Sequence, residues 1–226
     1  MTDAPRAIDA VIFDLDGVLA DTEILWFEAI RDLLAPAEFT WEHNLHLIGS
    51  TTEFTTDWLR RTFHRPESHE ELARKISAAV NEYVERITLD PMPGAPDLIE
   101  ALRGHGVPIA VASQSSPRWV ERTLRQIGLL EAFRFFVTSS EVPRGKPAPD
   151  IYLHAAARIG AAPARCLAIE DSAHGIEAAH AAGYHVVQIR HGVAPSPPQE
   201  RAHVILQSLH DFDLGWLHRP PRDGGV

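Results

Sequence analysis

Two aspartates at the end of an apolar run constrain this chain more than any other feature. Ile8–Phe13, apolar except for Asp9, lead straight into Asp14 and Asp16, and Gly17 follows. Residues two apart on an extended chain point to the same side, so both carboxylates can face one reacting atom. Buried like charges repel each other and lose their hydration. We therefore expect a cation beside them.

Two simpler interpretations of this stretch are a calcium loop and a turn with solvated acids. An EF-hand loop needs further oxygen ligands where this chain has Val18 and Leu19. A solvated turn does not explain the apolar strand that delivers the acids. We favour a functional pair, with one carboxylate as a nucleophile and the other as an acid and base.

Short apolar runs alternate with helical patterns along most of the chain. Nearly continuous apolar runs are typical of parallel strands that are covered on both faces, and their alternation with helices is typical of an α/β fold. We therefore predict a doubly wound parallel sheet with a Rossmann-like core. The expected strands are Ile8–Phe13, Pro108–Ala112, Phe135–Thr138, Cys166–Ile169, His185–Ile189 and Val204–Leu206, and the helices between them are Pro96–His105, Pro117–Ile127, Pro149–Ile159 and Ala173–Ala182.

The region 20–90 breaks this alternation. It contains helical patterns at Ile24–Leu34, Glu53–His64 and His69–Ile87, and no convincing strand. A proline-rich stretch, Pro91–Pro96, then leads back to the strand pattern. We predict two domains: an α/β catalytic core of residues 1–19 and 91–226, and an inserted helical cap domain of residues 20–90.

The composition of the chain limits the classes of binding partner that we expect. A net charge of −10 over 226 residues disfavours binding to nucleic acid or to anionic membranes. The single cysteine, Cys166, excludes an intrachain disulfide and is typical of a reducing compartment. No signal peptide and no apolar run of the roughly 20 residues needed to span a membrane are seen. We expect a cytoplasmic protein, a monomer or weak dimer, that acts on a small molecule.

Three further segments follow predicted strands and should meet the aspartates, since ligands bind at the carboxyl ends of such strands. Glu170 and Asp171 follow an apolar run; alone, Asp171 or Ser172 could simply cap the next helix. Beside Asp14 and Asp16, these carboxylates make an oxygen site for a hard cation, for which Mg²⁺ is the best candidate.

Ser113 and Lys146 belong to the other two segments. Ser113 lies in VASQSS, which is either an ordinary loop or a cradle for an anion at a helix N-terminus. Lys146 lies in GKPAPDIY, where Pro147 and Pro149 stiffen the loop. A lone lysine is usually a solvated surface charge, whereas a lysine fixed at the active edge can offset negative charge on a nucleophile and a phosphate.

Taken in order, Asp14–Leu19, Ser113, Lys146 and Glu170–Asp171 resemble the four motifs of the haloacid dehalogenase-like hydrolase superfamily. GKPAPDIY and IEDSAHGIEAAHAAG are similar to the branch that contains β-phosphoglucomutase and many sugar-phosphate phosphatases. That branch carries a helical cap after its first motif, at the place of residues 20–90. The resemblance covers nearly the whole chain.

The resemblance implies a role for each site residue. Asp14 would attack phosphorus and form an aspartyl-phosphate, while Asp16 would act first as an acid and then as a base. Mg²⁺ would be held by Asp14, the backbone carbonyl of Asp16 and Asp171, with Glu170 in direct contact or behind a water. The phosphoryl oxygens would be bound by Ser113, the N–H of Gln114 and Lys146. Further candidates for contact with the substrate are Leu15, Trp26 and Gly49.

We therefore expect a Mg²⁺-dependent phosphatase acting on a small phosphorylated metabolite, such as a sugar phosphate or similar phosphomonoester. A β-phosphoglucomutase has a histidine shortly after its first motif and a basic residue near the glycine loop of its cap. Here Trp26 and LIGSTTE stand at those places, and neither offers a basic group. This favours a phosphatase and leaves a sugar phosphomutase as the alternative. A catalytically idle binding protein is a remote one, because all the carboxylates of the motifs are present.

Overall fold

The computed structural model describes residues 7–48, 50, 52–86, 88–190 and 196–221. The chain divides into two compact units, and each is described by itself: a larger unit of Met1–Asp21 with Asp90–Val226, and a smaller unit of Thr22–Leu89. Among the described residues, no helix combines the length and the apolar character that a membrane span requires.

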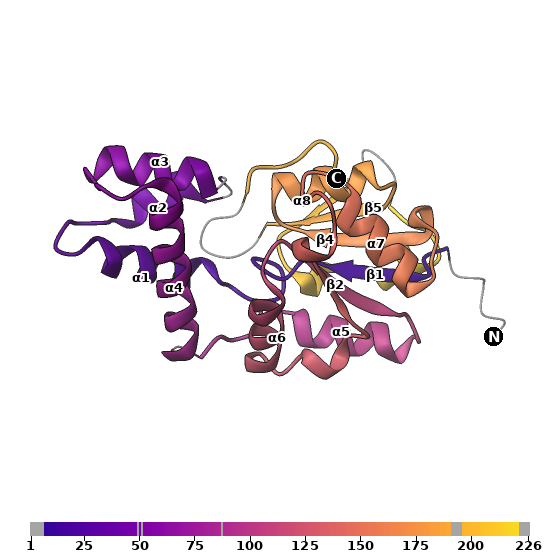
Figure 1. Ribbon diagram of the computed structural model, residues 1–226. Coiled ribbons are helices and arrows are strands. Elements are labelled where there is room, and N and C mark those ends of the chain that lie inside the picture. The colour runs from indigo at the N-terminus through magenta and orange to yellow at the C-terminus, as the bar shows by residue number, and fades with distance from the viewer. Residues whose placement is uncertain (1–6, 49, 51, 87, 191–195, 222–226) are drawn as a thin grey trace. The chain divides into compact units, whose positions relative to one another are not determined.

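The larger unit contains a six-stranded sheet in the order β3-β2-β1-β4-β5-β6, with all neighbours parallel. Figure 1 labels β1, β2, β4 and β5 of this sheet. The predicted α/β class is confirmed, and each predicted strand is present within two residues of its expected bounds. The strands are β1 (Ala10–Phe13), β2 (Ile109–Ser113), β3 (Phe136–Thr138), β4 (Cys166–Glu170), β5 (His185–Ile189) and β6 (Val204–Leu206).

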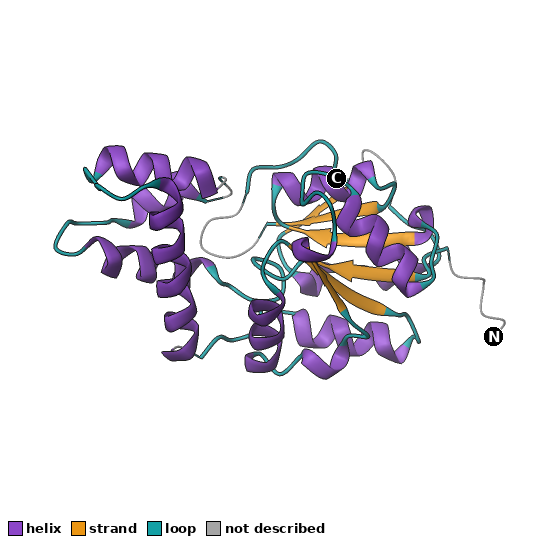
Figure 2. Ribbon diagram, in the orientation of Figure 1, coloured by secondary structure: helices purple, strands orange, loops and turns teal. Residues whose placement is uncertain are grey.

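Helices flank this sheet (Figure 2). On one face, α7 and α8 pack their buried apolar residues against small side chains of the central strands, such as Ala110, Ala112 and Ala168. The alternate residues of the same strands, including Val11, Val111 and Ile169, are also buried. Burial on both sides explains why these strands are continuously apolar. The helices of this unit are α5 (Ala95–Gly104), α6 (Pro117–Gln126), α7 (Asp150–Ile159) and α8 (Ala173–Ala181).

The smaller unit is helical. Its elements are α1 (Glu23–Leu34), α2 (Trp41–Leu47), α3 (Thr52–Thr62) and α4 (His69–Arg86). The sequence patterns predicted α1, α3 and α4, although the expected last residue of α4, Ile87, lies outside the described residues. They missed α2, which has only seven residues. It is held by a capping box in which Thr40 accepts from the N–H of His43, while the His43 ring accepts from the N–H of Thr40.

Candidate active site

The candidate site lies at the carboxyl edge of the sheet, where β1 is flanked by β2 and β4. Asp14 follows β1 directly, and its N–H donates to the carbonyl of Ile169 at 2.9 Å. Ser113 is the last residue of β2, and Glu170 is the last residue of β4. Parallel neighbours end on the same side, so three strands bring their terminal polar residues together, as the sequence patterns predicted.

Lys146 reaches this edge from the loop before α7. Its ammonium donates to Asp14 Oδ1 at 2.5 Å, to Glu170 Oε1 at 2.6 Å and to the carbonyl of Ala112 at 2.9 Å. The side chain is 3% exposed. A solvated surface lysine is therefore excluded. The three acceptors use all three N–H bonds of the ammonium and hold its charge between the two carboxylates.

Glu170 is fully buried and bonded at both oxygens. Oε1 accepts from the hydroxyl of Tyr152 at 2.6 Å as well as from Lys146, and Oε2 accepts from the hydroxyl of Ser172 at 3.2 Å. A Cβ at Gly175 would lie 2.0 Å from this carboxyl, so only glycine fits there on the first turn of α8. Ser172, not Asp171, caps that helix by accepting from the N–H of Gly175 at 3.1 Å.

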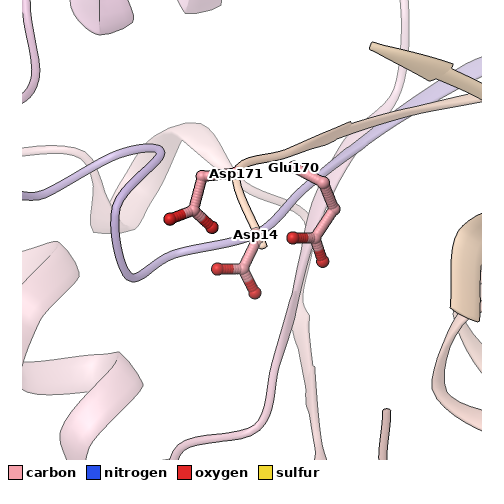
Figure 3. Close-up of side chains that lie close together, drawn as sticks. All are labelled: Asp14, Glu170 and Asp171. Atoms are coloured by element: carbon pink, nitrogen blue, oxygen red, sulfur yellow. The ribbon is translucent and has the colours of Figure 1, made fainter. Parts of the chain in front are cut away.

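The carboxylates of Asp14, Glu170 and Asp171 form one cluster (Figure 3). One oxygen from each lies within 4.8 Å of the others. Gly17 makes room for this arrangement: its φ is +80°, and a Cβ there would lie 2.2 Å from Asp171 Oδ2. Three acidic side chains gather here, and the ammonium of Lys146 contacts two of them, so the acidic groups outnumber it. This donor set of hard oxygens fits a divalent cation such as Mg²⁺.

The electrostatics of the protein alone support that fit. Burial raises the pKa of Asp14 to about 8; Lys146 opposes the shift, while Glu170 and Asp16 add to it. Burial lowers the pKa of Lys146, but Asp14 and Glu170 raise it more strongly, so it ends above its ordinary value and the ammonium stays charged. A carboxylate nucleophile must be ionised, and a cation at the cluster would restore the ionised form of Asp14.

Asp16 points its carboxylate toward the β2–α6 segment. Oδ2 accepts from the hydroxyl of Ser115 at 2.8 Å and lies 3.4 Å from that of Ser113, while Oδ1 accepts from the indole N–H of Trp119 at 2.9 Å. The side chain of Asp16 is thus held apart from the cluster of Asp14, Glu170 and Asp171. Only its backbone carbonyl remains available for the metal role that the resemblance implies.

The predicted phosphate-binding residues lie beside Lys146. The side-chain amide of Gln114 donates to the carbonyl of Lys146 at 3.2 Å and accepts from its N–H at 3.0 Å, which ties the two loops together. Ser116 caps α6, and the N–H of Ser115 just before that helix donates to the hydroxyl of Ser113 at 3.0 Å, so the start of the helix lies beside this hydroxyl, where an anion can be bound. Leu15 is fully buried, so only its backbone can meet a ligand.

The other two candidates belong to the smaller unit. Trp26 is 38% exposed and lines a cavity of about 370 Å³ within that unit. Gly49 lies outside the described residues. The cavity lining includes the polar residues Glu23, Asn44, Thr55, Thr56 and Ser77, and none of the described lining residues is Lys, Arg or His.

Four donors to the site carboxylates were not among the predicted site residues: Ser115 and Trp119, which donate to Asp16, and Tyr152 and Ser172, which donate to Glu170. A signal for Tyr152 was present, because a tyrosine on the apolar face of a helix needs a partner for its hydroxyl when buried. Nothing in the spacing predicts where the indole of Trp119 points.

Comparison with known proteins adds a family to this geometry. The model of haloacid dehalogenase-like hydrolases matches residues 8–183. A protein of Drosophila melanogaster named "Probable pseudouridine-5'-phosphatase" is 35% identical over 215 residues, which cover 92% of each chain. The β-phosphoglucomutase of Bacillus subtilis is 30% identical over 217 residues, covering 92% of this chain and 93% of that protein.

Two further similarities concern length and structure. The bifunctional riboflavin kinase/FMN phosphatase of Arabidopsis thaliana is 33% identical over 219 residues, but the match spans only 56% of that longer protein. Among solved structures, a HAD family hydrolase of Deinococcus radiodurans with bound phosphate and sodium is similar with a TM-score of 0.76 and 29% identity, covering 92% of this chain and 94% of that one.

Proposed function

Because the chain belongs to the haloacid dehalogenase-like hydrolases, we propose that it hydrolyses a small phosphomonoester through an aspartyl-phosphate on Asp14. The observation that carries this proposal is the buried triad in which Lys146 bridges Asp14 and Glu170 at the carboxyl edge of the sheet. A phosphoryl group that meets Asp14 there also meets an ammonium and a helix N-terminus. Phosphoryl transfer depends mainly on such positioning and charge neutralisation.

In the first half of the reaction, a carboxylate oxygen of Asp14 forms a bond to phosphorus and the ester P–O bond breaks. The electron pair of that bond goes to the leaving oxygen, which takes a proton from the carboxyl group of Asp16. Lys146 and the hydroxyl of Ser113 bind the oxygens of the transferring group. Their charge and dipole compensate the negative charge that the phosphoryl group carries through the transfer.

In the second half, water attacks the phosphorus of the aspartyl-phosphate and gives a proton to the carboxylate of Asp16. The bond between Asp14 and phosphorus breaks, and inorganic phosphate leaves. Both residues return to their starting states, so Asp16 serves as the acid and then the base. The tyrosine and serine donors on Glu170 keep that carboxylate in place, and Glu170 in turn fixes Lys146.

The acidic cluster is proposed to hold Mg²⁺ through Asp14, Asp171 and the backbone carbonyl of Asp16. A bound Mg²⁺ neutralises charge on the phosphoryl oxygens and on the carboxylates that surround them. The hydrogen bonds at both oxygens of Glu170 favour contact with the ion through water.

Removing divalent ions should abolish turnover. Exhaustive chelation leaves the carboxylate cluster uncompensated, and added Mg²⁺ should restore the rate, with Mn²⁺ as a possible substitute. Ca²⁺ should inhibit, because its longer bonds and higher coordination number disturb the geometry of transfer. The measurement is phosphate release from p-nitrophenyl phosphate. Full activity in chelated protein would contradict the role of Asp171.

The cavity of the smaller unit supports hydrolysis over mutase chemistry. A mutase must grip a second phosphate, for which Arg, Lys or His is the usual partner. The described lining residues offer the carboxylate of Glu23 and neutral polar groups instead. We propose that this cavity takes the neutral, hydroxyl-bearing body of a monophosphate, such as a sugar or polyol.

Two assays test this assignment. A screen of phosphorylated metabolites, read by phosphate release, should find the best substrates among monophosphates with neutral bodies. In the second assay, β-glucose 1-phosphate is supplied with a trace of the 1,6-bisphosphate, and glucose 6-phosphate and free phosphate are both followed. Formation of glucose 6-phosphate faster than phosphate release from any monoester in the screen would favour the mutase.

Trp26→Ala should raise KM for the best substrate of the screen by about tenfold, as expected when apolar contact with the substrate body is lost. The chemical step should change little. Ile24→Ala is the matched control, since Ile24 lies on the same helix with the same 38% exposure but outside the cavity lining. Equal KM values for Trp26→Ala and the wild-type protein would remove Trp26 from the substrate site.

The remaining expectations stay proposals. We propose that residues 1–19 and 91–226 act as the catalytic core and residues 20–90 as the cap that selects the substrate. We also propose a cytoplasmic enzyme that works as a monomer or weak dimer, with a small phosphorylated metabolite as its partner.

A further inference from the structure

Trp119 is a largely buried aromatic residue whose indole N–H donates to a carboxylate of the candidate site. Its ring is 7% exposed on the first turn of α6, and its N–H donates to Oδ1 of Asp16 at 2.9 Å. The hydroxyl of Ser115 donates to the other carboxylate oxygen at 2.8 Å. The two donors come from one short segment and fix both ends of one carboxylate, so they determine its plane and its direction.

We propose that Trp119 and Ser115 are positioning residues for Asp16, and that together they decide which of its oxygens delivers the proton. The inference rests on the proposed role of Asp16 as the acid and base. It concerns residues that contact neither the phosphoryl group nor the metal cluster directly.

The two donors, Trp119 and Ser115, differ in their capacity for hydrogen bonding. An indole N–H can only donate, whereas a hydroxyl can both donate and accept. A proton on Oδ1 would face the N–H of Trp119 and lose that hydrogen bond. A proton on Oδ2 can be accepted by Ser115 or passed to a substrate oxygen. Trp119 therefore keeps Oδ1 as an acceptor and assigns proton transfer to Oδ2.

The position of Oδ2 suits this assignment. It lies 3.4 Å from the hydroxyl of Ser113, the residue proposed to bind a phosphoryl oxygen. An acid on that side of the carboxyl group is close to the phosphorus centre whose leaving oxygen must be protonated. Proton transfer requires the acid to lie within hydrogen-bond reach of that oxygen. A rotation of the carboxyl group that turns Oδ2 away from the leaving oxygen would therefore slow its protonation.

The simpler interpretation is that Trp119 is a core residue whose N–H happens to be satisfied. Trp119→Phe separates the two, because it keeps an aromatic ring for packing and removes only the donor. Trp216→Phe is the matched control. Trp216 lies in the segment 214–217 and its ring packs against that of Phe212. The carbonyl of Leu217 in this segment accepts from the N–H groups of Ala7 and Ile8, so Trp216 lies near the start of β1, at the opposite end from Asp14 and Asp16.

The readout is the dependence on the leaving group. p-Nitrophenolate leaves without a proton, whereas an alkoxide needs one, so only alkyl phosphates report on the acid. We expect Trp119→Phe and Ser115→Ala each to lower kcat/KM roughly tenfold for the best alkyl phosphomonoester and less than about twofold for p-nitrophenyl phosphate. Trp216→Phe should leave both values unchanged. Equal losses on the two substrates, or no loss, in a folded Trp119→Phe protein would overturn the inference.

A double-mutant cycle with Asp16→Asn completes the test. Asp16→Asn alone should lower kcat/KM for the alkyl substrate about 10²–10⁴-fold. Adding Trp119→Phe should not further change the ratio of kcat/KM for the alkyl substrate to kcat/KM for p-nitrophenyl phosphate. A further change in that ratio would mean that Trp119 acts by another route. Equal losses on both substrates with Asp16→Asn alone would reject the proposed role of Asp16, and the inference with it. A selective loss with Asp16→Asn and an unselective one with Trp119→Phe would reject the inference only.

Discussion

Asp14→Asn should reduce turnover by about 10⁴- to 10⁶-fold, the range seen when a nucleophile is removed from an active site. The amide cannot form the aspartyl-phosphate and has lost a charged oxygen from the metal cluster. The measurement is phosphate release at saturating substrate and Mg²⁺. Asp9→Asn is the control, because Asp9 precedes the same strand but pairs with Arg165 at the surface. Appreciable turnover in folded Asp14→Asn protein would rule out the covalent mechanism.

The same variant should fold at least as well as the wild-type protein. Burial raises the pKa of Asp14 to about 8, whereas the pKa of an aspartate in an unfolded chain is about 4. A raised pKa means that the stability present below pH 4 is lost as the pH rises through 8. Asparagine has no such loss, so metal-free Asp14→Asn should gain stability relative to the wild-type protein over this interval. Denaturant unfolding of both proteins at pH 5 and pH 8 measures the difference.

The fold was predictable because its central strands, β1, β2 and β4, are buried on both faces. Runs such as Cys166–Ile169 carry no polar residue, so their ends can be located within a residue or two, and the polar residues after them mark one edge. The predicted family and hydrolase class are confirmed by the match over residues 8–183. The roles of the individual site residues stay predictions until the variants are measured.

What the sequence could not show depends on side-chain direction or on short elements. The seven-residue α2 is too brief for a periodic pattern. Trp119 and Asp16 lie about a hundred residues apart, and their contact arises only once β1 and β2 pair in register. The cap of α8 had two candidates in sequence, Asp171 and Ser172. Only the geometry assigns it to Ser172, which leaves Asp171 to the carboxylate cluster.

Lys146→Met should be the most damaging substitution for stability and activity together. The ammonium sits between Asp14 and Glu170 with 3% of its side chain exposed. Its removal leaves two buried carboxylates and the carbonyl of Ala112 without that donor. Breaking a buried ion pair from one side costs about 3–5 kcal/mol. Loss of a cation aimed at the transferring phosphoryl group should cost about 10²–10³-fold or more in kcat.

The pH dependence of the stability of Lys146→Met distinguishes the loss of the ammonium charge from a simple loss of packing. Without Lys146, no cation opposes the burial and the negative charge of Glu170 that raise the pKa of Asp14, so the pKa of Asp14 should rise further and its carboxyl group should stay protonated to higher pH. The stability deficit of Lys146→Met should therefore grow between pH 7 and pH 9, because wild-type Asp14 ionises near pH 8 whereas Asp14 of the variant stays protonated and keeps losing stability relative to the unfolded chain. A cavity or a lost methylene contact would give the same deficit at both values.

Two further variants define the requirement at this position. Arg144→Met removes a cation two residues away that is 69% exposed and pairs with Asp150, and it should leave stability and turnover almost unchanged, because an exposed ion pair contributes little. Lys146→Arg keeps the positive charge. In the wild-type protein one nitrogen donates to Asp14, Glu170 and Ala112 in three directions, whereas the N–H bonds of a guanidinium all lie in one plane and cannot reproduce this arrangement. We expect it to restore part of the stability and little of the activity. Wild-type rates in Lys146→Met would show instead that the ammonium serves only to neutralise the buried carboxylates.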